Sequence, residues 1–161
     1  MPVIHTPKLN EVAQQLEPLM GRATKVTAAS GPNKLEASCQ TARYVTRDDK
    51  LAALCQVDVG LAAALGAALA LLPAGAAEDA AKAGKLPDNL LDAFSEVANI
   101  LAGVLCVDGA LHVRWTTVAQ SQAELSADDK ALLAKPASRL DVTVEIEGFG
   151  AGKLSIVTAK R

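Results

Sequence analysis

Residues 92–105 read DAFSEVANILAGVL, and this stretch is typical of a helix with two distinct faces. Apolar residues recur at helical spacing and predict a buried stripe made of Phe94, Val97, Leu101, Val104 and Leu105. A second stripe contains Asp92, Glu96, Asn99 and Gly103. Asparagine and glycine are both unfavourable inside a helix, glycine by roughly 1 kcal/mol relative to alanine. A surface that retains both residues is a candidate for contact with another molecule.

The composition favours a folded cytoplasmic protein. The chain has 161 residues, of which 50% are hydrophobic, so it can build one domain with an apolar core. A net charge of −2, the absence of a Lys/Arg run and an aromatic content of 2% argue against a nucleic-acid partner. The first residues lack the pattern of a signal peptide, and the three cysteines and two histidines lack the spacing of metal ligands. We therefore expect buried free cysteines and no metal site.

One uncharged segment, residues 59–77, raises the question of a membrane span. A spanning helix needs about 20 strongly apolar residues. This segment is rich in alanine and contains Pro73 and Gly75 near its end. We expect a buried helix and no membrane span.

The remaining sequence alternates between helical and strand patterns. The first half predicts helices over residues 8–20, 60–72 and 76–83 and strands over 23–29, 35–46 and 51–59. The second half predicts strands over residues 111–118, 140–147 and 153–159, and a short helix that begins after Ser126 and ends at Ala134. Pro18 should kink the first helix or end it early. Alternation places Trp115 and Thr117 on the same face of their strand.

This order of elements predicts the α+β class, with long helices packed on one face of a mostly antiparallel sheet. We find no domain boundary and predict a single domain over residues 1–161. The sequence EVAQQL at residues 11–16 is similar to EVANIL at residues 96–101. This repeat suggests two related halves around a pseudo-two-fold axis.

The spacing of Asp92, Glu96 and Asn99, followed by Ile-Leu-Ala-Gly103, resembles the CheC, CheX and FliY phosphatases of bacterial chemotaxis. The helix motif of this family has Asp or Ser, then Glu, then Asn at these spacings. The first helix of this chain has Gln14 where the motif has Asn, which is most similar to CheX, where only the later helix keeps the active pair. The chain departs from the pattern at Gln122, where the family motif ends with a proline.

The resemblance implies that the chain hydrolyses the aspartyl phosphate of a response regulator in two-component signalling. Asn99 would position the attacking water, and Glu96 would bind the active-site lysine of the regulator. Asp92 would dock at the rim, and Gly103 would lower the surface so that a loop of the partner can approach. The chain would need no cofactor of its own, because Mg²⁺ would be bound by the phosphorylated receiver domain.

Three alternatives remain open at the level of sequence. A non-catalytic module of the same fold, as in flagellar switch proteins, would bind a receiver domain without removing its phosphate. A small-molecule domain would have a closed apolar pocket between residues 60–72 and the sheet. The third alternative is a solvated helix face without function, on which Asn99 bonds a neighbouring loop. A homodimer through a sheet edge is compatible with the phosphatase, the interaction module and the small-molecule domain, and residues 140–159 are the expected edge.

Overall fold

A six-stranded sheet forms the centre of the structure, a computed structural model that describes residues 4–107 and 109–160. The strands are β1 (Thr24–Ala28), β2 (Gln40–Thr46), β3 (Leu51–Val57), β4 (Val113–Ala119), β5 (Ser138–Ile146) and β6 (Gly150–Thr158). Their order across the sheet is β1-β5-β6-β3-β2-β4, and every neighbouring pair is antiparallel. The predicted hairpins are confirmed as β2–β3 and β5–β6.

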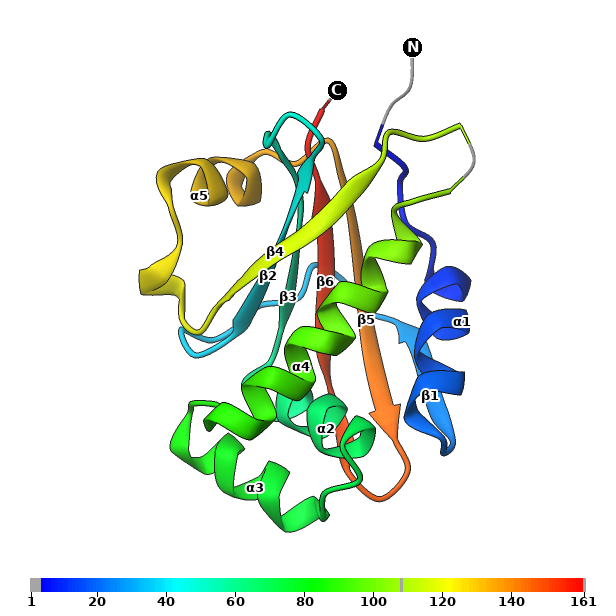
Figure 1. Cartoon of the computed structure of the whole chain (residues 1–161), viewed down its shortest axis with the longest axis vertical. Coiled ribbons are helices and arrows are strands. Elements are labelled where there is room, and N and C mark those ends of the chain that lie inside the picture. Colours follow the sequence, from blue (N-terminus) through cyan, green and yellow to red (C-terminus); the bar gives the residue numbers. More distant parts are fainter. Residues whose placement is uncertain (1–3, 108, 161) are drawn as a thin grey trace.

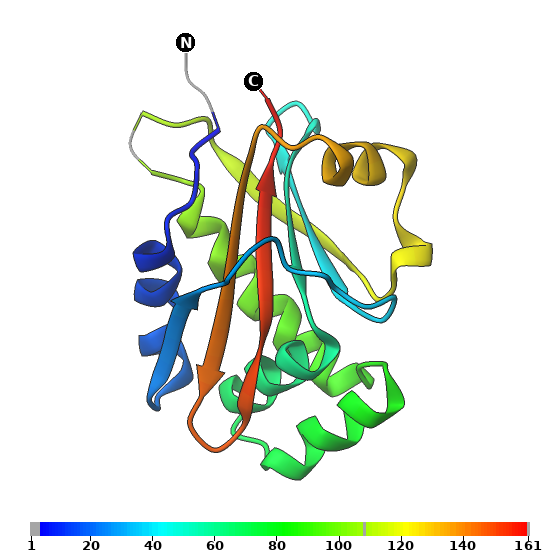
Figure 2. The same cartoon turned by 180° about the vertical axis from the view of Figure 1, so that it is seen from behind.

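The long helices cover one face of this sheet (Figure 1). They are α1 (Leu9–Met20), α2 (Val59–Leu69) and α4 (Asp88–Leu101), and α4 continues into a short 3-10 turn, η1 (Ala102–Val104). The helix α3 (Ala74–Ala83) packs on the outside of α2. On the opposite face, a 3-10 turn, η2 (Gln122–Glu124), precedes α5 (Ala127–Ala134), whose Leu132 packs against Leu54 and Val157 (Figure 2). The α+β class with helices on one face is therefore confirmed, and α5 is an addition on the other face.

The core lies between the sheet and α2, which is apolar on nearly every side. Alanines and leucines of α2 are buried along its length. A Cβ atom at Gly152 of β6 would lie 2.6 Å from Leu61 Cβ, so only glycine lets α2 approach the strand this closely. Among the described residues, no helix is long and apolar enough to cross a membrane, and α2 is a helix of the core.

The strand order shows that the chain consists of two related halves that exchange a strand with each other. The first half contributes α1-β1-β2-β3 and the second α4-β4-β5-β6. Exchanging β1 with β4, β2 with β5 and β3 with β6 turns the observed order into its own reverse. Each half also gives its first strand to the other, since β1 pairs with β5 and β4 pairs with β2. The topology thus has the predicted pseudo-two-fold symmetry, centred between β3 and β6.

Two local predictions are wrong. Helix α1 continues through Pro18 to Met20, so the early end expected at Pro18 does not occur, and the helix ends at Gly21, which has a left-handed backbone with φ of 66°. Pro18 is exposed in the last turn, where the carbonyl that loses its hydrogen bond can be solvated. In β4, the register shifts opposite Arg43 and Tyr44, and the bulge moves Thr117 away from the face on which Trp115 packs.

The expected dimerisation edge is also wrong. Strands β5 and β6, which contain residues 140–159, lie inside the sheet and are paired on both sides. The outer strands are β1 and β4. The β5–β6 hairpin was predicted correctly from the sequence. The pairing of β5 with β1 was not, because β1 lies more than a hundred residues away and no local sequence pattern indicates it. A homodimer through a sheet edge would have to use β1 or β4.

Candidate functional site

Helix α4 is held firmly by the core. Its buried residues are Leu90, Phe94, Val97, Ala98 and Leu101. A Cβ atom at Gly66 of α2 would lie 3.0 Å from the carbonyl oxygen of Leu90, so the two helices pack almost backbone to backbone. The hydroxyl of Tyr44 donates a hydrogen bond of 2.6 Å to the carbonyl oxygen of Ala98. Side chains on the outer face of α4 therefore project from a rigid support.

Asp92, Glu96 and Asn99 are exposed together on the outer face of α4. They follow one another at about one turn of the helix, so their side chains form a row. No hydrogen bond or ion pair joins any of these three side chains to another described residue. The alternative in which Asn99 bonds a neighbouring loop is thus not seen in the described part of the chain. The row can accept hydrogen bonds at two carboxylates and can both donate and accept at one carboxamide.

The related residues of α1 are engaged differently. Glu11 corresponds to Glu96 in the repeated sequence, but its carboxylate oxygens lie 2.8 and 3.0 Å from Nε2 of His5. One of these oxygens also accepts from the backbone N–H of Lys8 at the start of α1, at 2.9 Å. Glu11 is therefore used to fix the N-terminal segment and to cap the helix. Glu96, by contrast, has no such internal partner among the described residues.

Gly103 has a neighbour that the sequence did not predict. It is exposed and follows Asn99 by one turn, as expected for a low point in the surface. However, a Cβ atom built at Gly103 would lie 3.0 Å from Nε2 of Gln15 on α1. The side chain of Gln15 thus uses the space above the glycine. Gln15 and Gly103 are 88 positions apart, and hydrophobic periodicity does not indicate which residues of two helices meet. Gln15 was therefore not predicted as part of the site.

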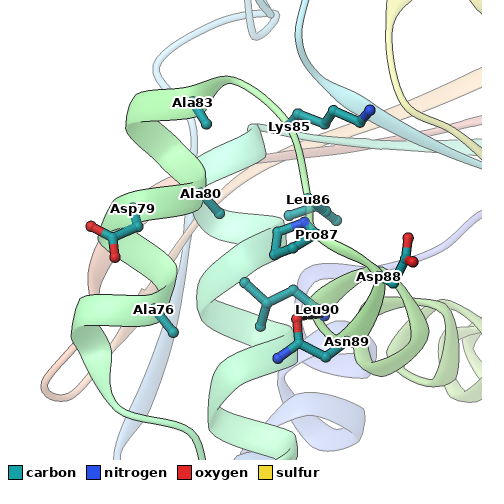
Figure 3. A pocket seen from close by; sticks show the side chains of 10 residues that line it. All are labelled: Ala76, Asp79, Ala80, Ala83, Lys85, Leu86, Pro87, Asp88, Asn89 and Leu90. Atoms are coloured by element: carbon teal, nitrogen blue, oxygen red, sulfur yellow. Dashed lines mark hydrogen bonds between the residues drawn. The ribbon is translucent and has the colours of Figure 1, made fainter.

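A groove borders the row at its other end (Figure 3). It measures about 660 Å³ and lies between α3 and the first turn of α4. Ala76 and Ala80 point across it towards Pro87 and Leu90. Asp88 stands on its rim, one turn before Asp92, so the groove is continuous with the row. Its walls are mostly apolar.

The interior offers no alternative chemistry in the part of the chain that the structure describes. Where the small-molecule alternative requires an apolar pocket, Leu61 packs directly on Gly152, and the pocket beside this contact, between α2, α3 and the start of β6, measures only about 120 Å³. Burial raises the pKa of the Cys55 thiol to about 12 and also raises the pKa of Cys39, so neither is a thiolate at neutral pH. No group of three or more His, Cys, Asp or Glu residues within residues 4–107 and 109–160 could hold a metal ion.

Comparison of the fold finds several solved structures. FliM from H. pylori, solved in complex with SpeE, has a TM-score of 0.64 at 11% identity, with 94% of this chain and 81% of that chain covered. FliY from Thermotoga maritima has a TM-score of 0.61 at 12% identity, with 96% and 85% covered. CheX from Borrelia burgdorferi, solved with CheY, BeF3 and Mg²⁺, has a TM-score of 0.55 at 13% identity, with 94% of each chain covered.

These similarities are structural only. No protein-family model matches the chain, and no curated protein matches it in sequence. The neighbours include CheX, FliY, a CheC-like chemotactic protein from Shewanella oneidensis and the middle domain of FliM. The chain therefore has the fold of the CheC, CheX and FliY proteins, and its similarity is not restricted to CheX.

Proposed function

We propose that this chain, with its CheC/CheX-type fold, binds a phosphorylated receiver domain through α4 and accelerates the hydrolysis of its aspartyl phosphate. The observation that carries the proposal is the exposure of Glu96 and Asn99, without internal partners, on one face of a rigid helix. Such a phosphatase would be a hydrolase of two-component signalling. Its substrate would be a cytoplasmic receiver domain, so we place the chain in the cytoplasm.

The reaction needs positioning rather than a strong acid or base. Water attacks the phosphorus atom, the bond between phosphorus and the aspartyl oxygen breaks, and inorganic phosphate leaves. Transfer of this kind depends mainly on alignment and on stabilisation of charge. The carboxamide of Asn99 can accept a hydrogen bond from the water and donate one beside it, which fixes the direction of attack. Mg²⁺ in the acidic pocket of the receiver would stabilise the phosphoryl charge.

The two carboxylates of the row would set the register of the complex. Glu96 would pair with the active-site lysine of the receiver, one turn away from the attacking water. Asp92 would contact the rim of the partner. The side chains of Asp92 and Glu96 make no ion pair within the described chain, so a cation of the partner would meet no internal competitor. A related complex supports this arrangement, because a CheX protein of the same fold was solved with CheY, BeF3 and Mg²⁺.

A non-catalytic interaction module is the second candidate. Gln122 stands where the family motif has a proline, and it begins η2 directly after β4. FliM, which has the same fold, was solved in complexes with SpeE and with FliG. In this version the α4 row binds a receiver domain but does not accelerate the loss of phosphate.

The decisive experiment measures the decay of phosphate on receiver domains from the same organism, in the presence of Mg²⁺. We expect the wild-type chain to accelerate decay, and Asn99→Ala to lower the acceleration by about 100-fold, because misplaced water removes the alignment. Glu96→Ala should weaken both binding and decay. Asp128→Ala, an exposed carboxylate on α5 at the opposite face of the sheet, is the matched control.

Each outcome selects one candidate. Accelerated decay that both α4 substitutions reduce, with unchanged circular dichroism, supports the phosphatase. Binding of a receiver without accelerated decay supports the interaction module. Neither binding nor decay with any receiver of the organism contradicts both candidates.

A further inference from the structure

The row of exposed side chains on α4 is followed by Gly103, which has no side chain, and a side chain of α1 lies in the space above it. Positions 92, 96, 99 and 103 share one face, and the last of them carries no side chain. The point where a Cβ atom of residue 103 would lie is 3.0 Å from Nε2 of Gln15 and 3.5 Å from its Cδ. The carboxamide of Gln15 therefore occupies the place of a side chain at position 103. It continues the row directly after Asn99.

The packing of α1 fixes where Gln15 points. Val12 and Leu16 of the same helix are fully buried, and Gln15 is half-buried between them and the surface. Its aliphatic part is thus covered while its carboxamide reaches the face of α4. No hydrogen bond joins this carboxamide to another described residue. Its donor and acceptor groups are consequently available beside Asn99.

The symmetry of the fold makes this arrangement specific to α4. Gln14, next to Gln15, is the residue that corresponds to Asn99 in the repeated sequence, and it is exposed. The residue in α1 that corresponds to Gly103 is Pro18, which is also exposed. A proline there occupies the space that the glycine leaves open. The contact between the two helices thus adds the side chain of Gln15 to the α4 row. This is possible at Gly103 because glycine has no side chain, whereas the corresponding position of α1 has a proline.

We propose that Gln15 is a further partner-contacting residue of the α4 site, and that Gly103 is the positioning residue that keeps the space for it. The inference rests on the proposed binding of a receiver domain. The carboxamide of Gln15 would donate to and accept from the backbone of the receiver loop that approaches Asn99. It would hold this loop and would not touch the attacking water. Gln15 should therefore determine affinity, whereas Asn99 should determine the rate of hydrolysis.

The test compares affinity with rate for the full chain. Affinity is measured by calorimetry with a receiver domain activated by Mg²⁺ and BeF3, and the rate by decay of the phosphorylated receiver at saturating and limiting concentrations. Gln15→Ala should raise Kd and KM about fivefold to tenfold, the effect of one lost hydrogen bond, and change kcat less than twofold. Gln14→Ala is the matched control on the same helix and should leave both values unchanged.

A double-mutant cycle tests the role of Gly103. Gly103→Ala would shift the carboxamide of Gln15 by a few tenths of an ångström and should weaken binding, though by less than Gln15→Ala. Combining the two substitutions should weaken binding no further than Gln15→Ala alone, because the second has nothing left to displace. Thermal unfolding of each variant shows whether a loss of affinity comes from a loss of fold, and we expect no lowering of Tm for Gly103→Ala.

The outcomes separate this inference from the proposed function. Unchanged affinity in Gln15→Ala, while Asn99→Ala still slows decay, overturns the role of Gln15 and leaves the phosphatase standing. Weaker binding in Gln14→Ala but not in Gln15→Ala also overturns it. Additive losses in the double variant overturn the role of Gly103. A wild-type chain that binds no activated receiver overturns the proposed function and this inference together.

Discussion

The hydroxyl of Tyr44 connects the sheet to the residue next to Asn99. Tyr44 is 1% exposed, and its hydroxyl donates to the carbonyl oxygen of Ala98, which lies near the end of α4. Burial raises the pKa of this tyrosine well above its usual value, so the hydroxyl remains a donor at any pH compatible with the fold. The last turn of α4, which carries Asn99, is thereby fixed to β2.

Tyr44→Phe tests this connection. The variant keeps the ring in the core but leaves the carbonyl of Ala98 without its partner. We expect the free energy of unfolding in urea to fall by about 1–2 kcal/mol. Ser155 of β6 also makes a short side-chain hydrogen bond, but to Asp141 and not to α4, so Tyr44→Phe should lower the rate of phosphate decay and Ser155→Ala should not. Equal stability of Tyr44→Phe and the wild type would contradict the assigned hydrogen bond.

At the scale of elements, a long crossover ties the two halves of the sheet together. The chain between β1 and β2 crosses β5 and β6 on the face of the sheet opposite the long helices, which is the near face in Figure 2. The side-chain amide of Asn33 donates to the carbonyl oxygens of Val142 and Leu154 and to the hydroxyl of Ser155. Asp141 accepts from the backbone of Asn33 at 3.0 Å and from Ser155 at 2.7 Å. These bonds anchor a segment that has no regular structure of its own.

Asp141 makes this anchor sensitive to acid. Its burial raises the pKa, but hydrogen bonds from Ser155, Arg139 and Asn33 outweigh burial and lower the pKa below the model-compound value of 3.8. A carboxyl group with a lowered pKa stabilises the fold above pH 3.8, and this stability is lost as the pH falls through the folded-state value.

We therefore expect Asp141→Ala to lower the free energy of unfolding at pH 7 by about 2–3 kcal/mol, the effect of lost hydrogen bonds to a charged group. The variant should also lose part of the acid dependence below pH 4 that the wild type shows in urea titrations. Asp92→Ala, which removes an exposed carboxylate without internal partners, should change neither quantity. Identical acid dependence in Asp141→Ala and the wild type would contradict this assignment.

The whole molecule depends on exchange of strands between its halves. Within residues 4–107 and 109–160, β1 pairs with β5 alone and β4 pairs with β2 alone. A half on its own would expose the apolar face that the other half covers and would leave its first strand unpaired.

A division of the chain in the turn at Gly84 tests this interdependence. We expect fragments 1–84 and 85–161 to be unfolded when separate, because fragment 1–84 lacks β5, the partner of β1, and fragment 85–161 lacks β2, the partner of β4. Mixed or co-expressed, they should form a complex with the circular dichroism and thermal transition of a folded chain. The measurement is circular dichroism of each fragment alone and of the mixture. A cooperative transition in either fragment alone would contradict the proposed dependence.

Local patterns in the sequence were sufficient for most elements. Apolar spacing predicted α4 and its exposed row, and strand-like runs on either side of a turn predicted both hairpins. What failed depends on distant contacts. The bulge opposite Arg43 and Tyr44 responds to the neighbouring strand, and the partners of β1 and β4 lie in the other half of the sequence. Gln15 reached the candidate site only because two helices cross at Gly103.

The pairing of Thr24 with Ile146 also has a consequence for synthesis on the ribosome. Strand β1 leaves the exit tunnel before its partner β5, which is made more than a hundred residues later. During translation β1 must wait, with its backbone groups exposed to other chains. Its short length of 5 residues and its exposed Lys25 reduce the risk of aggregation in this interval. The order of translation, and not only the final stability, thus favours a small and charged first strand.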